Sequence, residues 1–408
     1  MSSSVNSRVF VSGLGVVSAH ACQVDEFWRR IISSESAISN LENLPVDDLA
    51  IKFGGEIKNF QGEAVLEKKL LRRIDRFVQL ALVAAIDALE ASGIEKRIES
   101  KRIGIFISSG VGGLTTIQQA VLARNNGKRV SPFFIPGVIS NIASGYLSQL
   151  RKIEGPNYCI TSACSSSAHA LGEAMRMIRH GYLDAAIVGG AEAPLNDIAI
   201  AGFSSMNALS KRNEEPQKAS RPFDVNRDGF VMSEGAGVLI LESEKFTQDP
   251  VAEMIGYGTN SDAHHITSPP ENGSGARACM EQCFEDANFD PSQLDYVNMH
   301  GTSTRVGDVA ESRAIESCIP HALSGLHCSS TKSMTGHLLG AAASLEAIIC
   351  CLALKNGIIP ATINLNDQDP ECRLNYTPHK SIEKEMNYAL SNSFGFGGTN
   401  ASLLFKKV

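Results

Sequence analysis

The sequence predicts an α/β fold in which β-sheets are covered by helices on both faces. Short runs rich in β-branched residues, such as residues 8–15 (RVFVSGLG) and 102–113 (RIGIFISSGVGG), are typical of buried strands that end in glycine turns. They alternate with longer segments such as residues 77–93 (FVQLALVAAIDALEASG), which show helical spacing and a terminal glycine stop. This alternation is typical of α/β proteins with covered sheets.

The remaining expected strands continue the same pattern toward the C-terminus. They lie at residues 185–193 (AAIVGGAEA), 237–243 (GVLILES), 296–304 (YVNMHGTST) and 401–408 (ASLLFKKV). Two segments are also weakly self-similar, residues 157–181 and 326–357, because both predict a strand, a turn of small residues, an alanine-rich helix and a glycine stop. Any α/β protein repeats such units, so an internal duplication stays an open alternative. The segment near Pro250 is a plausible seam, which predicts domains at residues 1–250 and 251–408.

Composition narrows the class of protein. Hydrophobic residues make up 43% of the 408 residues and charged residues 20%, as in ordinary globular proteins, and the net charge of −7 argues against a general nucleic-acid binder. The N-terminal segment MSSSVNSRVFVSGLG shows no secretory signal pattern, and no uninterrupted apolar run approaches the ~18 residues of a membrane span. We therefore expect a cytoplasmic protein without a membrane span.

One of the ten cysteines stands apart from the others. The chain has no Cys-x-x-Cys pair, Cys279 and Cys283 lack a second pair for a zinc site, and Cys350 and Cys351 belong to a predicted core helix. This usage indicates a reducing compartment. Cys164 is the exception, because it lies among small hydroxylated residues in ITSACSSSAHALGEAM, where a strand ends and a helix begins.

A thiol at such a position is a candidate nucleophile. The N-terminus of a helix lowers a thiol pKa from ~8.5 toward ~3.5–7.5 and supplies backbone N–H groups for an oxyanion. We therefore expect a lowered pKa for Cys164. A buried cysteine in a tight turn is the structural alternative.

Two histidines and a lysine also lie at predicted strand ends. His300 enters a turn rich in glycine and hydroxyl groups, with Asp308 and Glu311 further along, and its position suits hydrogen bonding or proton transfer. Lys332 and His337 precede a glycine- and alanine-rich helix. The small, uncharged neighbours of Lys332 predict a lysine that faces a pocket or pairs with Glu311.

A glycine-rich loop, NSFGFGGTNAS, completes the set. Glycine permits positive φ angles and a close approach of the backbone, so such a loop can move or donate N–H groups. A nucleotide phosphate loop is the rival interpretation. The chain lacks GxxxxGK[ST], and GLGVVS lacks the third glycine of a dinucleotide fingerprint, which argues against nucleotides.

Together these motifs resemble the β-ketoacyl-[acyl-carrier-protein] synthases of the thiolase-like superfamily, and most closely type II. The resemblance runs nearly end to end and rests on SACSSS, HGTST…GD…AE, SSTKSMTGHLLGAA, NSFGFGGTN, RPFDVNRDGFVMSEGAG and DAHHITSPPENG. It implies a five-layered αβαβα fold built from two similar halves, and a homodimer. It also implies a decarboxylating Claisen condensation that lengthens an acyl chain by two carbons.

The resemblance assigns roles to individual residues. Cys164 would accept the acyl group as a thioester, with the N–H groups of Cys164 and Phe396 holding the oxyanion, and His300 and His337 would donate to the carbonyl of malonyl-carrier protein. Lys332 and Glu311 would order the site. Further positions follow the family's motifs: Thr302 and Thr304 for the phosphopantetheine arm; Gly395, Phe396 and Gly397 for the gate loop; Asp308 as a supporting carboxylate; and Val111 and Phe134 for the acyl pocket, with Phe134 expected to line the pocket of the partner subunit.

The expected partner is acyl carrier protein, which is acidic and brings the phosphopantetheine itself, so no cofactor or metal is expected. Local positive charge is then needed despite the negative total. Three basic clusters match the family's docking regions: Lys69, Arg72 and Arg73; Lys128 and Arg129; Lys211 and Arg212. A single cluster of this kind is more often an ordinary solvated face, and it is the match of all three that favours docking.

The chain departs from the family pattern at few positions. After HGTST it carries Arg305-Val306, where type II enzymes more often have Pro-Ala, and the helix after His337 has AAAS where a glycine is usual. Rival functions are a type I or polyketide-type condensing enzyme, a chain-length-factor-like decarboxylating partner, a thiolase and an acyl-binding structural protein. The presence of Cys164 disfavours the chain-length factor, and His337 disfavours a thiolase, which has a second cysteine there.

Overall fold

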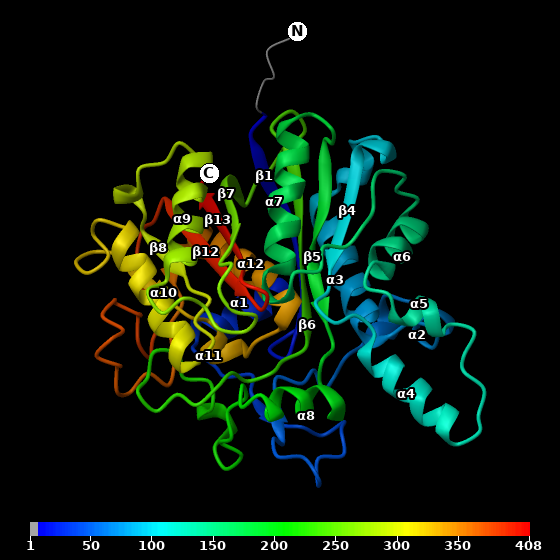
Figure 1. The fold of residues 1–408 in the computed structure, drawn as a ribbon. Coiled ribbons are helices and arrows are strands. Elements are labelled where there is room, and N and C mark those ends of the chain that lie inside the picture. The colour runs from blue at the N-terminus through cyan, green and yellow to red at the C-terminus, as the bar shows by residue number, and fades with distance from the viewer. Residues whose placement is uncertain (1–6) are drawn as a thin grey trace.

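The computed structural model describes residues 7–408 and confirms the predicted α/β fold (Figure 1). Nine strands join in one sheet in the order β4-β5-β6-β1-β7-β13-β12-β8-β9. Their bounds are Val9–Ser18 (β1), Ile103–Ser108 (β4), Ala185–Glu192 (β5), Gly235–Ser243 (β6), Ala252–Ser261 (β7), Tyr296–Asn298 (β8), His327–Ser329 (β9), Tyr388–Gly395 (β12) and Thr399–Lys406 (β13). Two small ribbons are formed by β2 (Ser39–Asn40) with β3 (Phe53–Gly54), and by β10 (Ile358–Ile359) with β11 (Ile382–Glu383).

The sheet consists of two halves that share a short junction. β1 pairs with β6 along its whole length, from Val9 opposite Ser243 to Ser18 opposite Gly235. It pairs with β7 only at Val9, Phe10 and Val11. The strands up to β6 therefore form one unit, and the strands from β7 onward form the other.

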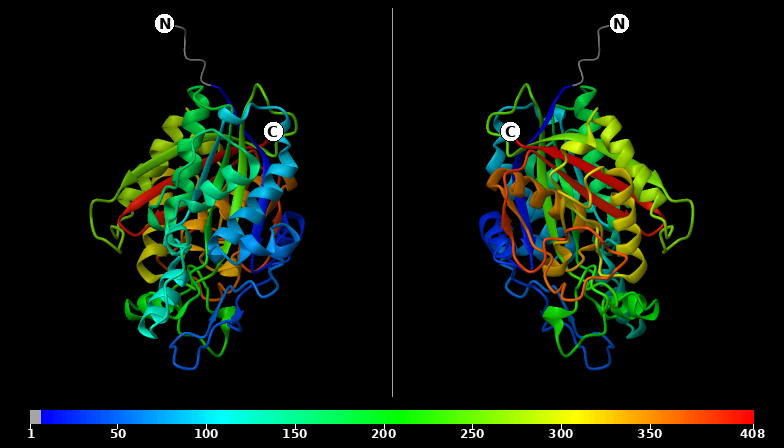
Figure 2. Two further views of the ribbon diagram at one scale, coloured as in Figure 1. Left: turned by 90° about the vertical axis from the view of Figure 1, so that its right-hand side faces the viewer. Right: turned by 90° about the vertical axis from the view of Figure 1, so that its left-hand side faces the viewer.

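Helices separate and cover these two units, giving five layers (Figure 1). On one outer face α3 (Arg76–Ser92) packs on β1, β5 and β6, and α6 (Ile142–Arg151) packs on α3 and β4. On the other outer face α9 (Ser274–Asp286) packs on β7 and β13, and α10 (Arg305–Cys318) packs on α9. The two outer layers face the viewer in turn in the panels of Figure 2.

The central layer consists of α7 (Ser166–Arg179) and α12 (Ala342–Asn356), which touch each other and strands of both units. The predicted five-layered αβαβα fold of two similar halves is therefore confirmed. The remaining helices are α1 (Val24–Ile32), α2 (Lys68–Leu71), α4 (Leu114–Asn125), α5 (Phe134–Val138), α8 (Asp197–Ser205) and α11 (Lys332–Thr335).

The sequence explains the ends of α3 well. The Asp75 side chain accepts the N–H of Phe77 and caps its start, and Gly93 ends it with a φ of 63°. Eleven of its 17 residues are buried, so burial and capping act on the same segment. The expected helix at residues 77–93 is confirmed to within one residue at each end.

Helix α12 of the central layer and the turn before it have an unusually apolar composition. By length and composition alone, Leu339–Asn356 is apolar enough to cross a membrane, but 89% of this segment is buried inside the protein. The segment contains one acidic side chain, that of Glu346, which is also buried. It is the core helix between the two sheets, and its buried carboxylate reappears in the site described next.

Candidate active site

A cavity of about 630 Å³ lies between the two halves. Its wall includes Val111 and Cys164 from the first half and His300, His337 and Phe396 from the second. The structure thus brings together residues separated by more than 230 positions in the chain, and both units are needed to form the site.

The serines around Cys164 hold the turn that presents it. Cys164 lies in a 3-10 turn, Ala163–Ser165, directly before α7, and Ala163 has a φ of 51°. The Ser166 hydroxyl donates to the Ala163 carbonyl at 2.6 Å and accepts the Ser162 N–H at 2.9 Å. The Ser165 hydroxyl donates to carbonyls of the second half, including that of Thr399 at 2.8 Å. The hydroxyl-rich motif therefore satisfies backbone groups that a strained turn leaves unpaired.

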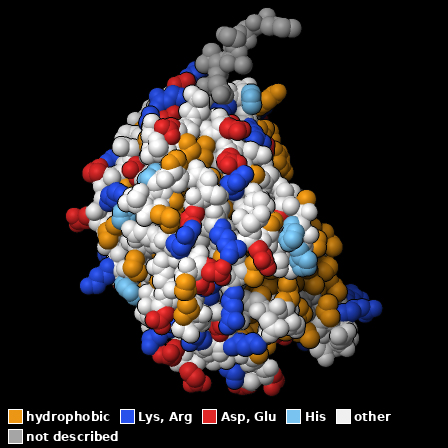
Figure 3. All heavy atoms as spheres, turned by 60° about the vertical axis from the view of Figure 1, so that its left-hand side comes forward, with side chains coloured by type: hydrophobic (Ala, Val, Ile, Leu, Met, Phe, Trp, Pro, Cys, Tyr) orange, Lys and Arg blue, Asp and Glu red, His pale blue; other side chains and the backbone are white. Residues whose placement is uncertain are grey.

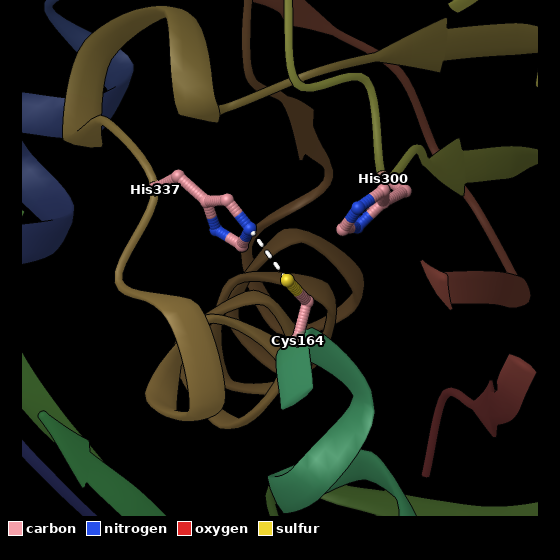
Figure 4. A group of neighbouring side chains, drawn as sticks. All are labelled: Cys164, His300 and His337. Atoms are coloured by element: carbon pink, nitrogen blue, oxygen red, sulfur yellow. Dashed lines mark hydrogen bonds between the residues drawn. The ribbon is translucent and has the colours of Figure 1, made fainter. Parts of the chain in front are cut away.

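Three functional side chains meet at this turn (Figure 4). The Nε2 atom of His337 lies 3.0 Å from the Cys164 sulfur, and the rings of His300 and His337 are 5.5 Å apart at an angle of 85°. The two histidines approach the sulfur from separate loops of the second half, as Figure 4 shows. A carbonyl oxygen entering between them would meet two imidazole nitrogens and the thiol together.

Burial dominates the charge state of these groups. Burial raises the pKa of the Cys164 thiol to about 11, although the Lys332 charge and the Phe396 N–H both lower it. The expectation of a lowered pKa is therefore wrong, because desolvation of the thiolate outweighs the helix start. Burial also lowers the pKa of His300 and of His337 well below the usual value, and Lys332 adds to both shifts. Near neutral pH the thiol and both imidazoles are uncharged.

Lys332 pairs with a different carboxylate from the one expected. Its ammonium group donates to Glu346 in α12, and both side chains are buried. Of the two alternatives predicted for Lys332, pairing with Glu311 is therefore wrong, and Lys332 is not among the residues that line the cavity. Glu346 was missed by sequence reasoning, although a single acidic residue inside the apolar run AAASLEAIICCLALKNG was the signal that could have found it, because a buried charge needs a partner.

Glu311 and Asp308 hold loops of the backbone instead. Glu311 accepts the N–H groups of His300 and Gly301, each at 2.8 Å, and burial raises its pKa to about 7. Asp308 accepts the N–H of Phe223 at 2.9 Å, and burial raises its pKa to about 6 despite a nearby arginine. Glu311 thereby orients the loop from which His300 projects.

A second buried carboxylate was also missed. Glu192, at the end of β5, accepts the N–H of Gly110 at 2.7 Å and the N–H of Gly340 at 2.9 Å, and its pKa is raised by burial. It joins the loop beside Val111 to the turn that follows His337. The motif AAIVGGAEA gave no clue beyond an acidic residue at a strand end.

The predicted gate loop forms the turn between β12 and β13. The Phe396 N–H faces the Cys164 sulfur, and Gly395 and Phe396 line the cavity, whereas Gly397 is not among the lining residues. Gly397 adopts a φ of 86°, which favours glycine, and its N–H donates to the Ile266 carbonyl at 2.6 Å. The loop thus lines the cavity beside the nucleophile on one side and is hydrogen-bonded on the other to the segment around Ile266.

The expected substrate positions divide into two groups. Thr302, Thr304 and Val111 line the cavity, and the hydroxyl oxygens of the two threonines are 3.0 Å apart. Phe134 lies in α5 and is not among the residues that line the cavity. Within one chain Phe134 therefore takes no part in this pocket.

The basic clusters lie within or after α2, α4 and α8 in the chain, and these three helices are found toward the lower end of the molecule in Figure 1. Most of these side chains are exposed, namely those of Lys69, Arg72, Arg73, Lys128, Arg129 and Lys211, and Arg212 is half-buried. The Lys211 ammonium donates to Asn207, which lines the cavity. The Arg73 guanidinium stacks 4.8 Å from the centre of the Phe133 ring. Basic and acidic side chains are mixed on the face shown in Figure 3, and hydrophobic ones gather at its right-hand edge.

The same three catalytic candidates have the donor set of a metal site. One atom from each of Cys164, His300 and His337 lies within 4.8 Å of the other two. Thiolate and imidazole are ligands that Zn²⁺ accepts, so the residues present could hold such an ion.

Comparisons with known proteins agree over both halves. The family described as Beta-ketoacyl synthase, N-terminal domain, matches residues 6–246, and Beta-ketoacyl synthase, C-terminal domain, matches residues 251–366. The 3-oxoacyl-[acyl-carrier-protein] synthase 2 of Vibrio harveyi is 44% identical, covering 98% of this chain and 99% of that protein. The protein of the same name from Synechocystis is 41% identical, covering 98% of each chain.

Solved structures give the same picture. A β-ketoacyl synthase from Burkholderia phymatum superposes with a TM-score of 0.90 at 32% identity, covering 98% of this chain and all of that one. A ketosynthase of a type II polyketide system, solved with its acyl-carrier protein and bound to the hexaketide, superposes with a TM-score of 0.90 at 30% identity, covering 99% of this chain and all of that one.

Proposed function

The chain belongs to the β-ketoacyl synthase family, and we propose that it joins an acyl group held on Cys164 to malonyl-acyl carrier protein, giving 3-oxoacyl-acyl carrier protein and CO₂ in fatty acid elongation. It is an acyltransferase of the 3-oxoacyl-[acyl-carrier-protein] synthase type. One observation carries the assignment of residues: His337 Nε2 lies 3.0 Å from the Cys164 sulfur, beside His300, in the wall of the cavity.

In the first half-reaction the Cys164 sulfur attacks the acyl thioester, and the carrier's thiol leaves. The resting thiol keeps its proton, because burial raises its pKa to about 11. That proton must reach the departing sulfur, and His337 Nε2 is the base close enough to pass it on. The Phe396 N–H already faces the sulfur, so it is placed to receive the oxyanion together with the Cys164 N–H.

In the second half-reaction malonyl thioester loses CO₂, and negative charge develops on its carbonyl oxygen. His300 and His337 are neutral at pH 7, because burial lowers their pKa values well below the usual value. A neutral imidazole donates its N–H without losing the proton, so both rings stabilise the enolate as hydrogen-bond donors. The carbanion then attacks the acyl-cysteine carbonyl, which breaks the bond to sulfur and releases the 3-oxoacyl product. The Cys164 thiolate that leaves takes up one proton from water, which restores the resting thiol.

Lys332 acts as a positioning residue in this scheme. Its ammonium group pairs with Glu346, and its positive charge lowers the pKa values of His300 and His337. Glu311 fixes the backbone of His300 through the two N–H groups it accepts. Both residues act through the histidines.

The partner in this proposal is acyl carrier protein, which brings the phosphopantetheine arm, so no cofactor belongs to the enzyme. A related ketosynthase was solved with its acyl-carrier protein. The basic clusters of this chain, Lys69, Arg72 and Arg73, Lys128 and Arg129, and Lys211 and Arg212, suit an acidic partner. The reaction needs no metal, so activity should persist in EDTA, and added Zn²⁺ should inhibit by binding the Cys164, His300 and His337 donors.

The assembly in this proposal is a homodimer in the cytoplasm. Large apolar side chains are exposed on and around α4 and α5, a pattern that favours a covered interface: Val121, Leu122, Val130, Phe133, Ile135 and Ile139. Phe134 lies in the same region and would reach the partner's pocket. Light scattering that finds a stable, active monomer would overturn the homodimer.

The direct test of the function uses the purified enzyme with acyl-carrier proteins of several chain lengths and malonyl-carrier protein. We expect equimolar CO₂ and 3-oxoacyl-carrier protein. Release of CO₂ without product would instead indicate a decarboxylating partner subunit. Product formation only from long poly-oxo intermediates would indicate a polyketide-type enzyme.

A further inference from the structure

We propose that Arg305, at the mouth of the cavity, binds the phosphate of the carrier's phosphopantetheine arm. This inference rests on the proposed function and adds a specificity residue to it. Of the residues that line the cavity, Arg305 is the one lysine or arginine in the described range 7–408.

Arg305 lies where the wall of the cavity reaches the surface. The segment from His300 to Arg305 begins beside the Cys164 sulfur and continues through Thr302 and Thr304, and all four of these residues line the cavity. Arg305 and Val306 are exposed, and Val306 keeps 47% of its surface accessible. An arm that enters toward Cys164 along this segment therefore passes Arg305 at its outer end.

The backbone of Arg305 is held firmly while its charge stays unpaired. The buried Arg227 donates from Nη2 to the Arg305 carbonyl at 2.7 Å and from Nε to the Thr304 carbonyl at 3.0 Å. The Nε of Arg305 makes a long contact of 3.5 Å with the Arg227 carbonyl. Among residues 7–408, its two terminal nitrogens have no hydrogen-bond partner, and no carboxylate forms an ion pair with it.

Acidic groups that line the same cavity are already engaged, so they leave the Arg305 charge available to a ligand. Asp228 accepts the Lys211 N–H at 3.1 Å and lies 3.7 Å from the Arg212 guanidinium. Asp262 accepts the Asn400 amide at 2.7 Å. Glu311 accepts two backbone N–H groups.

A planar guanidinium at this place suits a phosphate better than a lone carboxylate. Its fork binds two oxygens of a phosphate at once, and such charge-assisted bonds are strong. Arg305 is also the first residue of α10, and helix starts favour anions. The ligand class is therefore the phosphate that joins the pantetheine arm to its carrier, which must stay near the surface while the thioester reaches Cys164.

The test compares Arg305→Gln with the intact enzyme on three malonyl donors: malonyl-pantetheine, which lacks phosphate; malonyl-phosphopantetheine; and malonyl-carrier protein. We expect KM for both phosphate-bearing donors to rise about threefold to tenfold, and KM for malonyl-pantetheine to change less than twofold. In Arg305→Lys the KM for the phosphate-bearing donors should rise less than in Arg305→Gln, because the positive charge is kept. The matched control is Arg313→Gln, an exposed arginine of the same helix that pairs with Glu371 and does not line the cavity.

Each other outcome overturns the proposal. A rise in KM for malonyl-carrier protein alone would indicate that Arg305 binds a carboxylate of the carrier. An equal rise in KM for all three donors would indicate that Arg305 only packs against the wall of the cavity. A second readout does not depend on turnover: phosphopantetheine should protect Cys164 from alkylation better than pantetheine does, and Arg305→Gln should remove that difference. Failure of the condensing function would leave this protection intact, whereas equal protection by the two compounds in the intact enzyme would contradict the role of Arg305.

Discussion

Cys164 and Gly340 occupy corresponding places in the two halves of the molecule. Each is the central residue of a 3-10 turn, Ala163–Ser165 or Leu339–Ala341, that leads directly into a central helix. The residue before each has a positive φ, 51° at Ala163 and 47° at Leu339. The same local backbone thus occurs twice, as expected for two similar halves.

The surroundings of the two turns differ completely. Cys164 opens to the cavity, whereas a Cβ atom on Gly340 would lie 2.5 Å from the Gly110 nitrogen and 2.8 Å from a Glu192 oxygen. One turn therefore presents a nucleophile, and the other packs tightly and places His337 three residues earlier. The two halves therefore have different roles in the reaction because the same turn faces an open cavity in one half and tightly packed atoms in the other.

The largest expected effect comes from the histidines of the second half. His300→Ala or His337→Ala should lower the condensation rate by about 10²–10³, because each removes a donor to the enolate oxygen. In His300→Ala the acyl adduct on Cys164 should still form, which separates the labour of the two halves. The rate of CO₂ release and the rate of acylation, measured separately, show which step each histidine serves. His180 is exposed at the end of α7, so His180→Ala is the control. Equal loss of both steps in His300→Ala would contradict the division.

The buried carboxylate behind His300 predicts a dependence of stability on pH. Burial raises the pKa of Glu311 from its ordinary 4.5 to about 7. The folded state therefore binds this proton more tightly, so the contribution of Glu311 is full below about pH 4.5 and is lost as the pH rises to about 7. Between these limits the loss is about 3 kcal/mol.

Denaturant unfolding of the intact enzyme and Glu311→Gln at pH 4 and pH 8 isolates this effect from the histidines, which act with the opposite sign. The variant should gain relative stability as the pH rises. Glu281→Gln, an exposed residue paired with Arg277, is the control and should show no such trend. A difference between enzyme and Glu311→Gln that does not change with pH would show that Glu311 is not a buried carboxylate of raised pKa.

The turn at Gly340 should not accept a side chain as the turn at Cys164 does, because the space around it is filled. Gly340→Ala places a methyl group against the Gly110 nitrogen and Glu192, and overpacking of this kind costs about 1–3 kcal/mol of unfolding free energy. Gly145→Ala in α6 meets no atom within 4 Å, so it should leave stability unchanged or raise it by up to about 1 kcal/mol. Thermal unfolding compares the two variants. A Gly340→Ala protein as stable as the parent would show that the two turns are interchangeable.

The smallest effect concerns the first half's surface. Reversing Arg72 and Arg73 to glutamate should raise KM for carrier-bound substrates about twofold to tenfold, because exposed charges act weakly and mainly through encounter. A pantetheine thioester should be unaffected. Equal effects on both substrates would exclude this cluster from docking.

Much of this architecture could be predicted from the sequence. The strand and helix pattern predicted an α/β fold with covered sheets, and the family resemblance implied its αβαβα layers. Helix α3 was predicted almost to its ends because capping and burial agree there. The motifs around Cys164, His300 and His337 identified residues that the structure places in contact. Each of these predictions depends on residues close together in the sequence, so it can be made without knowing the tertiary contacts.

The predictions that were wrong or missing depended on contacts between residues that are distant in the sequence. The partner of Lys332 is Glu346 because the two residues meet inside the central layer, which no spacing rule reveals. The pKa of Cys164 follows the depth of its burial, and the helix start alone predicts the wrong direction. Glu192 was invisible for the same reason, since its partners Gly110 and Gly340 come from both halves.

The central claim is that Cys164 carries the acyl group formed in the first half-reaction and that both histidines stabilise the enolate in the second. Intact-protein mass spectrometry after mixing with acyl-carrier protein alone tests it most directly, beside Cys164→Ala. The account predicts an acyl adduct on the enzyme, absent in Cys164→Ala, that malonyl-carrier protein discharges with release of CO₂. An adduct that persists in Cys164→Ala, or steady CO₂ release with no adduct at any chain length, would contradict it.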